Sequence, residues 1–154
     1  MNIIFSKYRS FLCIAVVTAL FFLYGINHSS ATGINIILSG EEEVPPVKTS
    51  AFGKSNIIVA NNKSIIGTVS TKGMVAVAAH IHEGAHGKNG PIIITLKKVS
   101  ANEWEIPPDT RLTEGQFANY KAGNLYLNVH SATYKIGEIR GQIIDSKFNH
   151  HLKD

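Results

Sequence analysis

Residues 74–83 read MVAVAAHIHE, and the alternation along this stretch indicates the fold. Successive side chains of a β-strand point to opposite sides. One expected face is apolar and consists of Val75, Val77, Ala79 and Ile81. The other ends in histidines and consists of Ala76, Ala78, His80 and His82. The stretch therefore predicts a strand with one core face and one polar face that carries two imidazoles.

The same alternation is present in residues 125–131 (LYLNVHS) and 138–144 (EIRGQII). Their apolar sides consist of Leu125, Leu127 and Val129 in the first stretch, and Ile139, Gly141 and Ile143 in the second. Their polar sides consist of Tyr126, Asn128 and His130, and of Glu138, Arg140 and Gln142. Each stretch thus predicts a strand whose polar face collects groups capable of chemistry.

Further short apolar or β-branched runs predict the remaining strands: 34–38, 55–60, 64–70, 91–96 and 103–106. The Asn-Asn-Lys sequence at 61–63 is a turn signal that predicts a hairpin between the second and third of these runs. Residues 112–121 predict one short helix before Gly123. We therefore expect an all-β domain, an antiparallel immunoglobulin-like β-sandwich of about seven or eight strands.

The first 31 residues predict a cleavable signal peptide. Lys7 and Arg9 form a positive n-region, and an apolar run of fourteen residues follows at 11–24. A membrane span needs about 20 residues, so this run is short for one. Ser29 and Ala31 are the small residues that a signal peptidase reads. We expect cleavage after Ala31 and a secreted or periplasmic protein without a stable membrane anchor; an uncleaved anchor is the alternative.

The predicted organisation is a signal peptide over 1–31, a β-sandwich over 32–145 and a polar C-terminal tail over 146–154. Cys13 is the only cysteine and lies in the signal, so the mature domain must be held together by its core. Without the signal, 13 basic and 11 acidic side chains leave a net charge of +2. This charge is too small to indicate nucleic acid or an anionic membrane, whereas an extracytoplasmic protein partner stays open.

The His-Ile-His sequence at 80–82 is the clearest candidate for chemistry. Its two imidazoles, His80 and His82, project from one strand face, and His130 ends another strand on its polar side. If those strands are neighbours, three imidazoles converge, and His86 in a glycine-rich loop is a more weakly indicated fourth ligand. Three or four neutral imidazoles suit copper, which we favour, or zinc. The alternative is that these histidines are solvated or hydrogen-bonded polar side chains, as we interpret His150 and His151 in the tail.

Charged residues near these histidines predict a supporting role. Glu83 or Glu138 is expected to add an oxygen ligand or to orient a ligand histidine. Arg140 shares a strand face with Glu138, and we favour an ion pair between them over a catalytic carboxylate. The run Glu41–Glu43 is interpreted as a solvated loop, with calcium as the alternative ligand. We expect no catalytic residue and no organic cofactor, because no nucleophile motif or phosphate-binding loop is present in the sequence.

The chain resembles the CHRD domain family, named for chordin. The matching segments are 38–40 (LSG), 43–46 (EVPP), Gly53, 79–84 (AHIHEG), 89–91 (NGP), 125–130 (LYLNVH) and 137–143 (GEIRGQI). They run in the family's order and together cover about residues 34–144. The resemblance implies a secreted domain and leaves its biochemical role open.

A weaker likeness is to copper-zinc superoxide dismutases, which are also β-sandwich proteins. Residues 80–83 look like the first copper-ligand pair of that family, and Val129-His130 looks like a later copper-ligand strand. The mature chain lacks the dismutase cysteine pair and a convincing aspartate zinc ligand after His86. We therefore favour a non-enzymatic binding domain with one metal ion. The alternatives are a structural or protein-interaction module without metal and a dismutase-like redox enzyme.

Overall fold

The structure is a computed structural model that describes residues 33–149. In this part of the chain, nine strands and one helix follow one another. They are β1 (Ile34–Ser39), β2 (Phe52–Val59), β3 (Ile65–Lys72), β4 (Ala76–Glu83), β5 (Ile92–Thr95), β6 (Lys97–Lys98), β7 (Glu103–Glu105), α1 (Glu114–Lys121), β8 (Leu125–Ser131) and β9 (Ile139–Gln142). All paired strands are antiparallel, so the all-β antiparallel class is confirmed.

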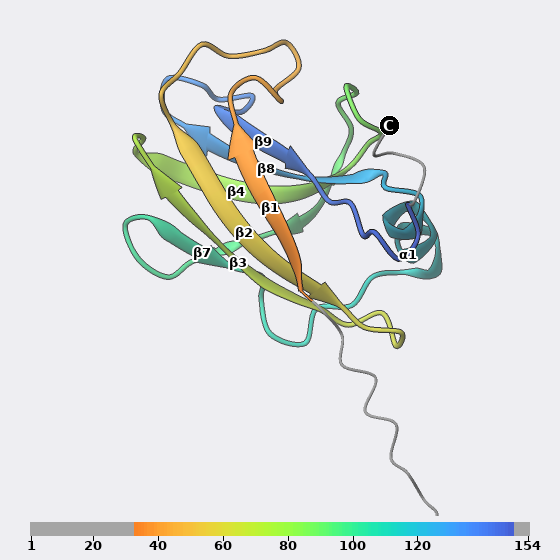
Figure 1. The fold of residues 1–154 in the computed structure, drawn as a ribbon. Helices are drawn as coiled ribbons and strands as arrows, with labels where there is room; N and C mark the ends of the chain where they lie inside the picture. Colours follow the sequence, from red (N-terminus) through yellow and green to blue (C-terminus); the bar gives the residue numbers. More distant parts are fainter. Residues whose placement is uncertain (1–32, 150–154) are drawn as a thin grey trace, which may run out of the picture. The chain divides into compact units, whose positions relative to one another are not determined.

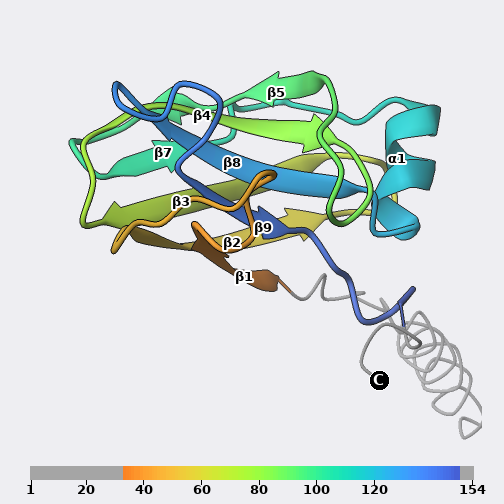
Figure 2. The same ribbon diagram turned by 90° about the horizontal axis from the view of Figure 1, so that it is seen from above.

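The nine strands belong to one continuous sheet in the order β5-β4-β8-β9-β1-β2-β3-β7-β6. The sheet curls into a nearly closed, barrel-like arrangement, in which β4, β5 and β8 face β1, β2 and β3 (Figure 1 and Figure 2). An immunoglobulin-like sandwich has two separate sheets. Here the halves are joined, because β9 pairs with both β8 and β1. Strands β9 and β1 are paired at one position, where Ser39 lies opposite Arg140.

The core lies between the two halves and is filled by the apolar face of each long strand. On β8 and β9, the predicted core residues are fully buried: Leu125, Leu127, Val129 and Ile139. Facing residues of the other half are buried to the same degree: Leu38, Ile57, Ile65 and Val69. Removal of this apolar surface from water is the main term that stabilises a domain without disulfides.

Strand β4 departs from the predicted alternation at its start. Its register with β8 shifts between Ala76 and Ala78, which marks a β-bulge. An extra residue in one strand reverses the two faces on one side of the bulge. Val75 and Val77, expected in the core, are therefore 80% and 54% exposed, whereas Ala76 is buried. The rest of the strand keeps the predicted faces.

Helix α1 begins and ends with recognisable caps. The side chain of Thr113 accepts a hydrogen bond from the Gln116 backbone, and the side chain of Gln116 accepts one from the Thr113 backbone. This reciprocal pair is a capping box. Gly123, just after the helix, has a φ of +74°, a conformation that glycine adopts without strain.

The chain packs against this helix up to the last described residue. Tyr120 of α1 is buried and donates a hydrogen bond to the carboxylate of Asp145. The ring of Phe148 lies edge-on to Tyr120 at 6.0 Å between centroids, and buried Asn149 donates to the Asp145 carbonyl at 3.1 Å. Residues 146–149, which the sequence assigns to a polar tail, thus pack on the domain.

Several sequence predictions fall outside the described residues, namely the signal peptide over 1–31 with Cys13, and the histidines at 150 and 151. Between residues 33 and 149, no helix has both the length and the apolar character needed to cross a membrane.

Candidate metal centre

Three histidines from two neighbouring strands converge on one face of the sheet. Strand β4 pairs with β8 so that His130 lies opposite Ala78, and Asn128 lies opposite His80. One ring nitrogen from each of His80, His82 and His130 lies within 4.8 Å of the other two. We call these three residues the histidine cluster. The structure thus brings together three of the four histidines that the sequence singles out.

The face that carries the histidine cluster is covered by loops. Every residue of β8 is buried, and Tyr126 and Asn128 of its polar side are each 2% exposed. Contacts with this layer come from three loops: Glu43 in the first, Ala85 and Lys88 in the second, and Lys135 in the third. A period-two pattern separates polar from apolar faces but does not show which polar face is covered.

Backbone carbonyls hold the outer ring nitrogens of two of these histidines. The Nδ1 atom of His82 lies 2.9 Å from the Gly90 carbonyl oxygen, and Nδ1 of His130 lies 3.0 Å from that of Lys135. A carbonyl oxygen only accepts hydrogen bonds, so each Nδ1 carries the proton and donates it. Each Nε2 atom therefore carries a lone pair and no proton. Metal-ligating histidines are commonly oriented in this way.

The inner nitrogens contact one another or have no partner. The Nε2 atom of His130 lies 2.8 Å from Nδ1 of His80, so His80 donates this hydrogen bond. The Nε2 atom of His82 is buried and has no hydrogen-bond partner among the described residues. A buried polar atom without a partner costs about 1–3 kcal/mol. A hydrogen-bond donor or a metal ion beside this nitrogen would satisfy its lone pair.

Burial lowers the pKa of all three imidazoles. For His80, burial lowers the pKa to about 4, with smaller contributions in the same direction from His130 and His82. Burial also lowers the pKa of His82 and that of His130, although their hydrogen bonds to backbone carbonyls act in the opposite direction. The three imidazoles are therefore neutral at neutral pH, the form that binds metal.

Tyr126 and Arg140 form a stacked column behind His82. The rings of Tyr126 and His82 are nearly parallel, at 4.8 Å between centroids and 10° between planes. The guanidinium carbon of Arg140 lies 3.5 Å from the centroid of the Tyr126 ring. The Tyr126 hydroxyl accepts a hydrogen bond from the Gly90 backbone at 3.1 Å. Tyr126 therefore contacts both the His82 ring and the residue whose carbonyl orients it.

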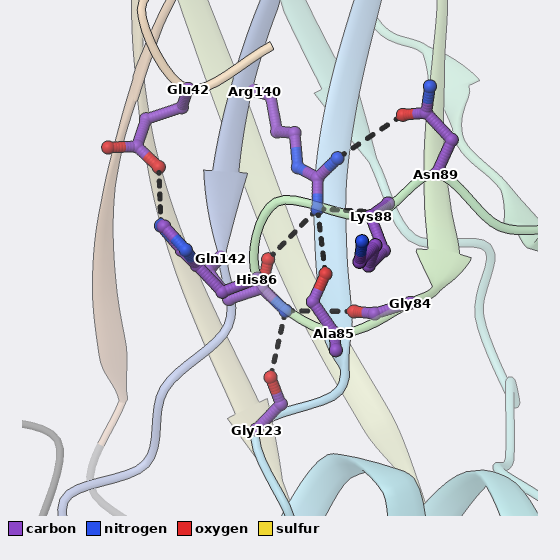
Figure 3. A network of polar contacts seen from close by, with 9 residues as sticks. All are labelled: Glu42, Gly84, Ala85, His86, Lys88, Asn89, Gly123, Arg140 and Gln142. Atoms are coloured by element: carbon purple, nitrogen blue, oxygen red, sulfur yellow. Dashed lines mark hydrogen bonds and ion pairs between the residues drawn. The ribbon is translucent and has the colours of Figure 1, made fainter. Parts of the chain in front are cut away.

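Arg140 organises the loop that supplies this carbonyl (Figure 3). Its side chain is 1% exposed and donates hydrogen bonds to the carbonyls of Ala85 and Lys88 at 3.3 and 3.0 Å. It also donates to the side-chain oxygens of Asn89 and Gln142 at 3.4 and 3.2 Å. A planar guanidinium with five donors can hold several loop oxygens at once. The position of the loop is therefore tied to β9.

The other charged residues predicted at the site lie elsewhere. His86 is 75% exposed, and its Nε2 atom lies 3.3 Å from a carboxylate oxygen of Glu42 (Figure 3). Glu83 is half-buried at the end of β4 and does not belong to the histidine cluster. Among the described residues, Glu138 does not form the expected ion pair with Arg140; its carboxylate accepts a hydrogen bond from Thr49 at 2.8 Å.

Glu43 is a buried carboxyl that the sequence analysis places in a solvated loop. It is 4% exposed and accepts a hydrogen bond from the Asn128 side chain at 2.7 Å. Burial raises its pKa to about 7, although Arg140 and a backbone hydrogen bond at Val44 act in the opposite direction. In the sequence, Glu43 differs from its acidic neighbours Glu41 and Glu42 because it belongs to the EVPP segment, one of the segments that resemble the CHRD family.

The fold and the histidine cluster define a class of protein: a small all-β domain that carries three neutral imidazoles on a covered polar face of its sheet. The chain belongs to the CHRD domain family, whose model matches residues 34–143. This range begins with β1 and includes the whole of β9. The resemblance seen in the sequence is thereby confirmed. Comparisons with curated proteins and with solved structures gave no match.

Proposed function

We propose that this CHRD domain protein is extracytoplasmic and binds one metal ion at the histidine cluster, with copper favoured and zinc the alternative. The observation that carries the proposal is that three ring nitrogens lie within 4.8 Å of one another. Metal–nitrogen bonds of about 2.0–2.1 Å place tetrahedral ligand atoms about 3.4 Å apart. Small side-chain movements therefore bring all three nitrogens into bonding distance of one ion.

A purely structural role accounts for the histidine cluster less well. Buried polar atoms in proteins are normally satisfied by protein groups or ordered water. The Nε2 atom of His82 has no hydrogen-bond partner among the described residues, although the ring is oriented by its hydrogen bond to Gly90 and by stacking on Tyr126. A bound metal ion would accept this lone pair, and it would replace the hydrogen bond between His80 and His130 once His80 presents an unprotonated ring nitrogen. The metal-binding proposal therefore gives the unsatisfied nitrogen a role.

A binding role is favoured over catalysis by the composition of the site. The histidine cluster contains no carboxylate, and its three imidazoles are all needed as ligands. Among residues 33–149, the grouped ligating side chains are these three imidazoles, so a proton-transfer role would need a group outside the histidine cluster. The extracytoplasmic location is supported by the sequence of residues 1–31, with its positive start, its short apolar run and its small residues at 29 and 31.

Calorimetric titration of the purified protein with copper and with zinc at neutral pH tests the proposal. A background with His150→Ala and His151→Ala removes the histidines of the tail. One equivalent of metal is expected to bind, and His82→Ala or His130→Ala should abolish that binding, because each removes an oriented nitrogen. The matched control is His86→Ala, since this exposed histidine lies outside the histidine cluster. Unchanged affinity in His82→Ala, or loss of binding in His86→Ala, would contradict the proposal.

A protein-interaction module is the second candidate, and one observation favours it. Three large apolar side chains near the ends of β4 and β8 are strongly exposed: Val75 at 80%, Val77 at 54% and Ile136 at 77%. Exposed apolar side chains are common components of protein interfaces. Recovery of one specific extracytoplasmic partner, equally with and without a chelator, would favour this candidate over metal binding.

A further inference from the structure

The histidine cluster offers a metal ion three neutral nitrogen donors and no negative charge. Within residues 33–149, the potential metal ligands that lie close together are only His80, His82 and His130. The buried carboxyls of Glu43 and Glu138 accept hydrogen bonds from Asn128 and Thr49 instead. The charge of a bound ion is therefore not neutralised by its ligands.

Burial makes this lack of neutralisation costly for highly charged ions. His82 and His130 are each 8% exposed, and His80 is half-buried. The cost of moving an ion out of water rises with the square of its charge, so a divalent ion loses about four times as much hydration energy as a monovalent ion of equal size. A covered site of neutral donors therefore favours the lower charge.

A fixed positive charge strengthens this preference. Arg140 stacks on Tyr126 at 3.5 Å from the ring centroid, and Tyr126 stacks on His82. The side-chain and backbone oxygens that accept hydrogen bonds from this guanidinium are all uncharged. The carboxyls of Glu43 and Glu42 also act on this guanidinium and offset part of its positive charge. Each added positive charge on a bound ion is thus repelled from the side of His82.

Three donors also suit an ion of low coordination number. Zinc is four-coordinate and takes a water as its fourth ligand where only three histidines bind it, and divalent copper prefers a tetragonal set of nitrogen and oxygen donors. Monovalent copper has a filled d shell and accepts three donors without a geometric penalty. We propose that the histidine cluster is a cuprous-ion site that holds copper as Cu(I) in preference to Cu(II) and Zn(II). This inference rests on the metal-binding function proposed above.

Competition titrations test the preference. The purified protein is titrated with Cu(I) against bicinchoninate under anaerobic, reducing conditions, and with Cu(II) and Zn(II) against chelators of known affinity. We expect Cu(I) to bind about 100-fold more tightly than Cu(II). That ratio raises the midpoint potential of the bound copper by about 120 mV over a site without preference. Binding of Cu(II) or Zn(II) as tight as that of Cu(I), and lost in His82→Ala, would overturn the cuprous assignment and leave metal binding intact. Failure of all three ions to bind would overturn both.

Two substitutions of Arg140 separate its charge from its hydrogen bonds. Arg140→Lys keeps the positive charge, Arg140→Gln removes it, and both lose the planar fork that holds the loop. The copper-loaded Gln variant is expected to have a lower midpoint potential than the Lys variant, because the repulsion of Cu(II) is relieved. Equal potentials would overturn the role given to this charge. If neither variant folds, the potential of the unmodified protein decides the proposal.

Discussion

Replacement of Glu43 by glutamine measures the free energy of ionising a buried carboxyl. Burial raises the pKa of Glu43 from an ordinary 4.5 to about 7. Because the folded state has the higher pKa, it binds the proton more tightly than the unfolded chain does. The stability that this proton contributes is complete below the unfolded pKa and is lost as the pH rises through the folded pKa. One pKa unit is worth about 1.4 kcal/mol, so the loss amounts to about 3 kcal/mol when the carboxyl is fully ionised.

A glutamine at this position does not titrate, and its side-chain oxygen can still accept the hydrogen bond from Asn128. The free energy of unfolding of Glu43→Gln, relative to the unmodified protein, is therefore expected to increase by about 2–3 kcal/mol between about pH 4.5 and about pH 8. The imidazoles of the histidine cluster titrate in both proteins, so their contributions largely cancel in this difference. The change with pH therefore reports on Glu43.

Urea denaturation at several pH values, with a chelator present, gives the required free energies. The matched control is Glu41→Gln, because Glu41 lies in the same loop and is exposed; its difference from the unmodified protein at each pH is the baseline for Glu43→Gln. A Glu43→Gln difference that stays constant against this baseline would refute the reasoning, since it would mean that Glu43 ionises as it does in water. A change of opposite sign would mean that Arg140 holds the carboxylate ionised in the folded state.

Two further substitutions test the packing of the polar layer and of the chain end. Gly137 has a φ of +154°, and a Cβ atom there would contact Glu43 and Asn128, so Gly137→Ala is expected to lower the free energy of unfolding by about 2–4 kcal/mol. Thermal denaturation checks this, and an unchanged midpoint would show that the loop moves aside freely. Tyr120→Phe removes the hydroxyl that donates to buried Asp145, at an expected cost of about 1–3 kcal/mol in urea denaturation. A neutral effect would show that water replaces the phenol.

The strands that carry the histidine cluster follow from the sequence because most of their side chains alternate between the two faces of the sheet. In β8, Leu127 and Val129 are buried in the core, while Asn128 and His130 take the opposite face, as the alternation predicts. In β4 the alternation fails at Val77, because the bulge is a property of the pairing with β8. Because the bulge depends on the neighbouring strand, the sequence of β4 alone does not predict it.

The surroundings of the histidine cluster depend on loops, where the sequence carries little periodic information. The sequence predicts that Arg140 pairs with Glu138, two residues away on the same strand, but three of its four hydrogen-bond partners lie in the loop at 85–89, more than fifty residues earlier. Glu43 meets Asn128 across a separation of 85 residues. Contacts of this kind follow from the order of the strands, which places β4, β8, β9 and β1 side by side and which alternation within single strands cannot predict.

The anchor of His130 is a main-chain atom, and this affects how the site can change over evolution. Every amino acid supplies a carbonyl oxygen, so the side chain of Lys135, which is exposed, is free to vary without loss of the hydrogen bond to His130. What must be preserved is the length of the segment between β8 and β9, because an insertion or a deletion there would move the carbonyl. In related chains we therefore expect residue identity at position 135 to drift while the spacing between His130 and Gly137 stays fixed.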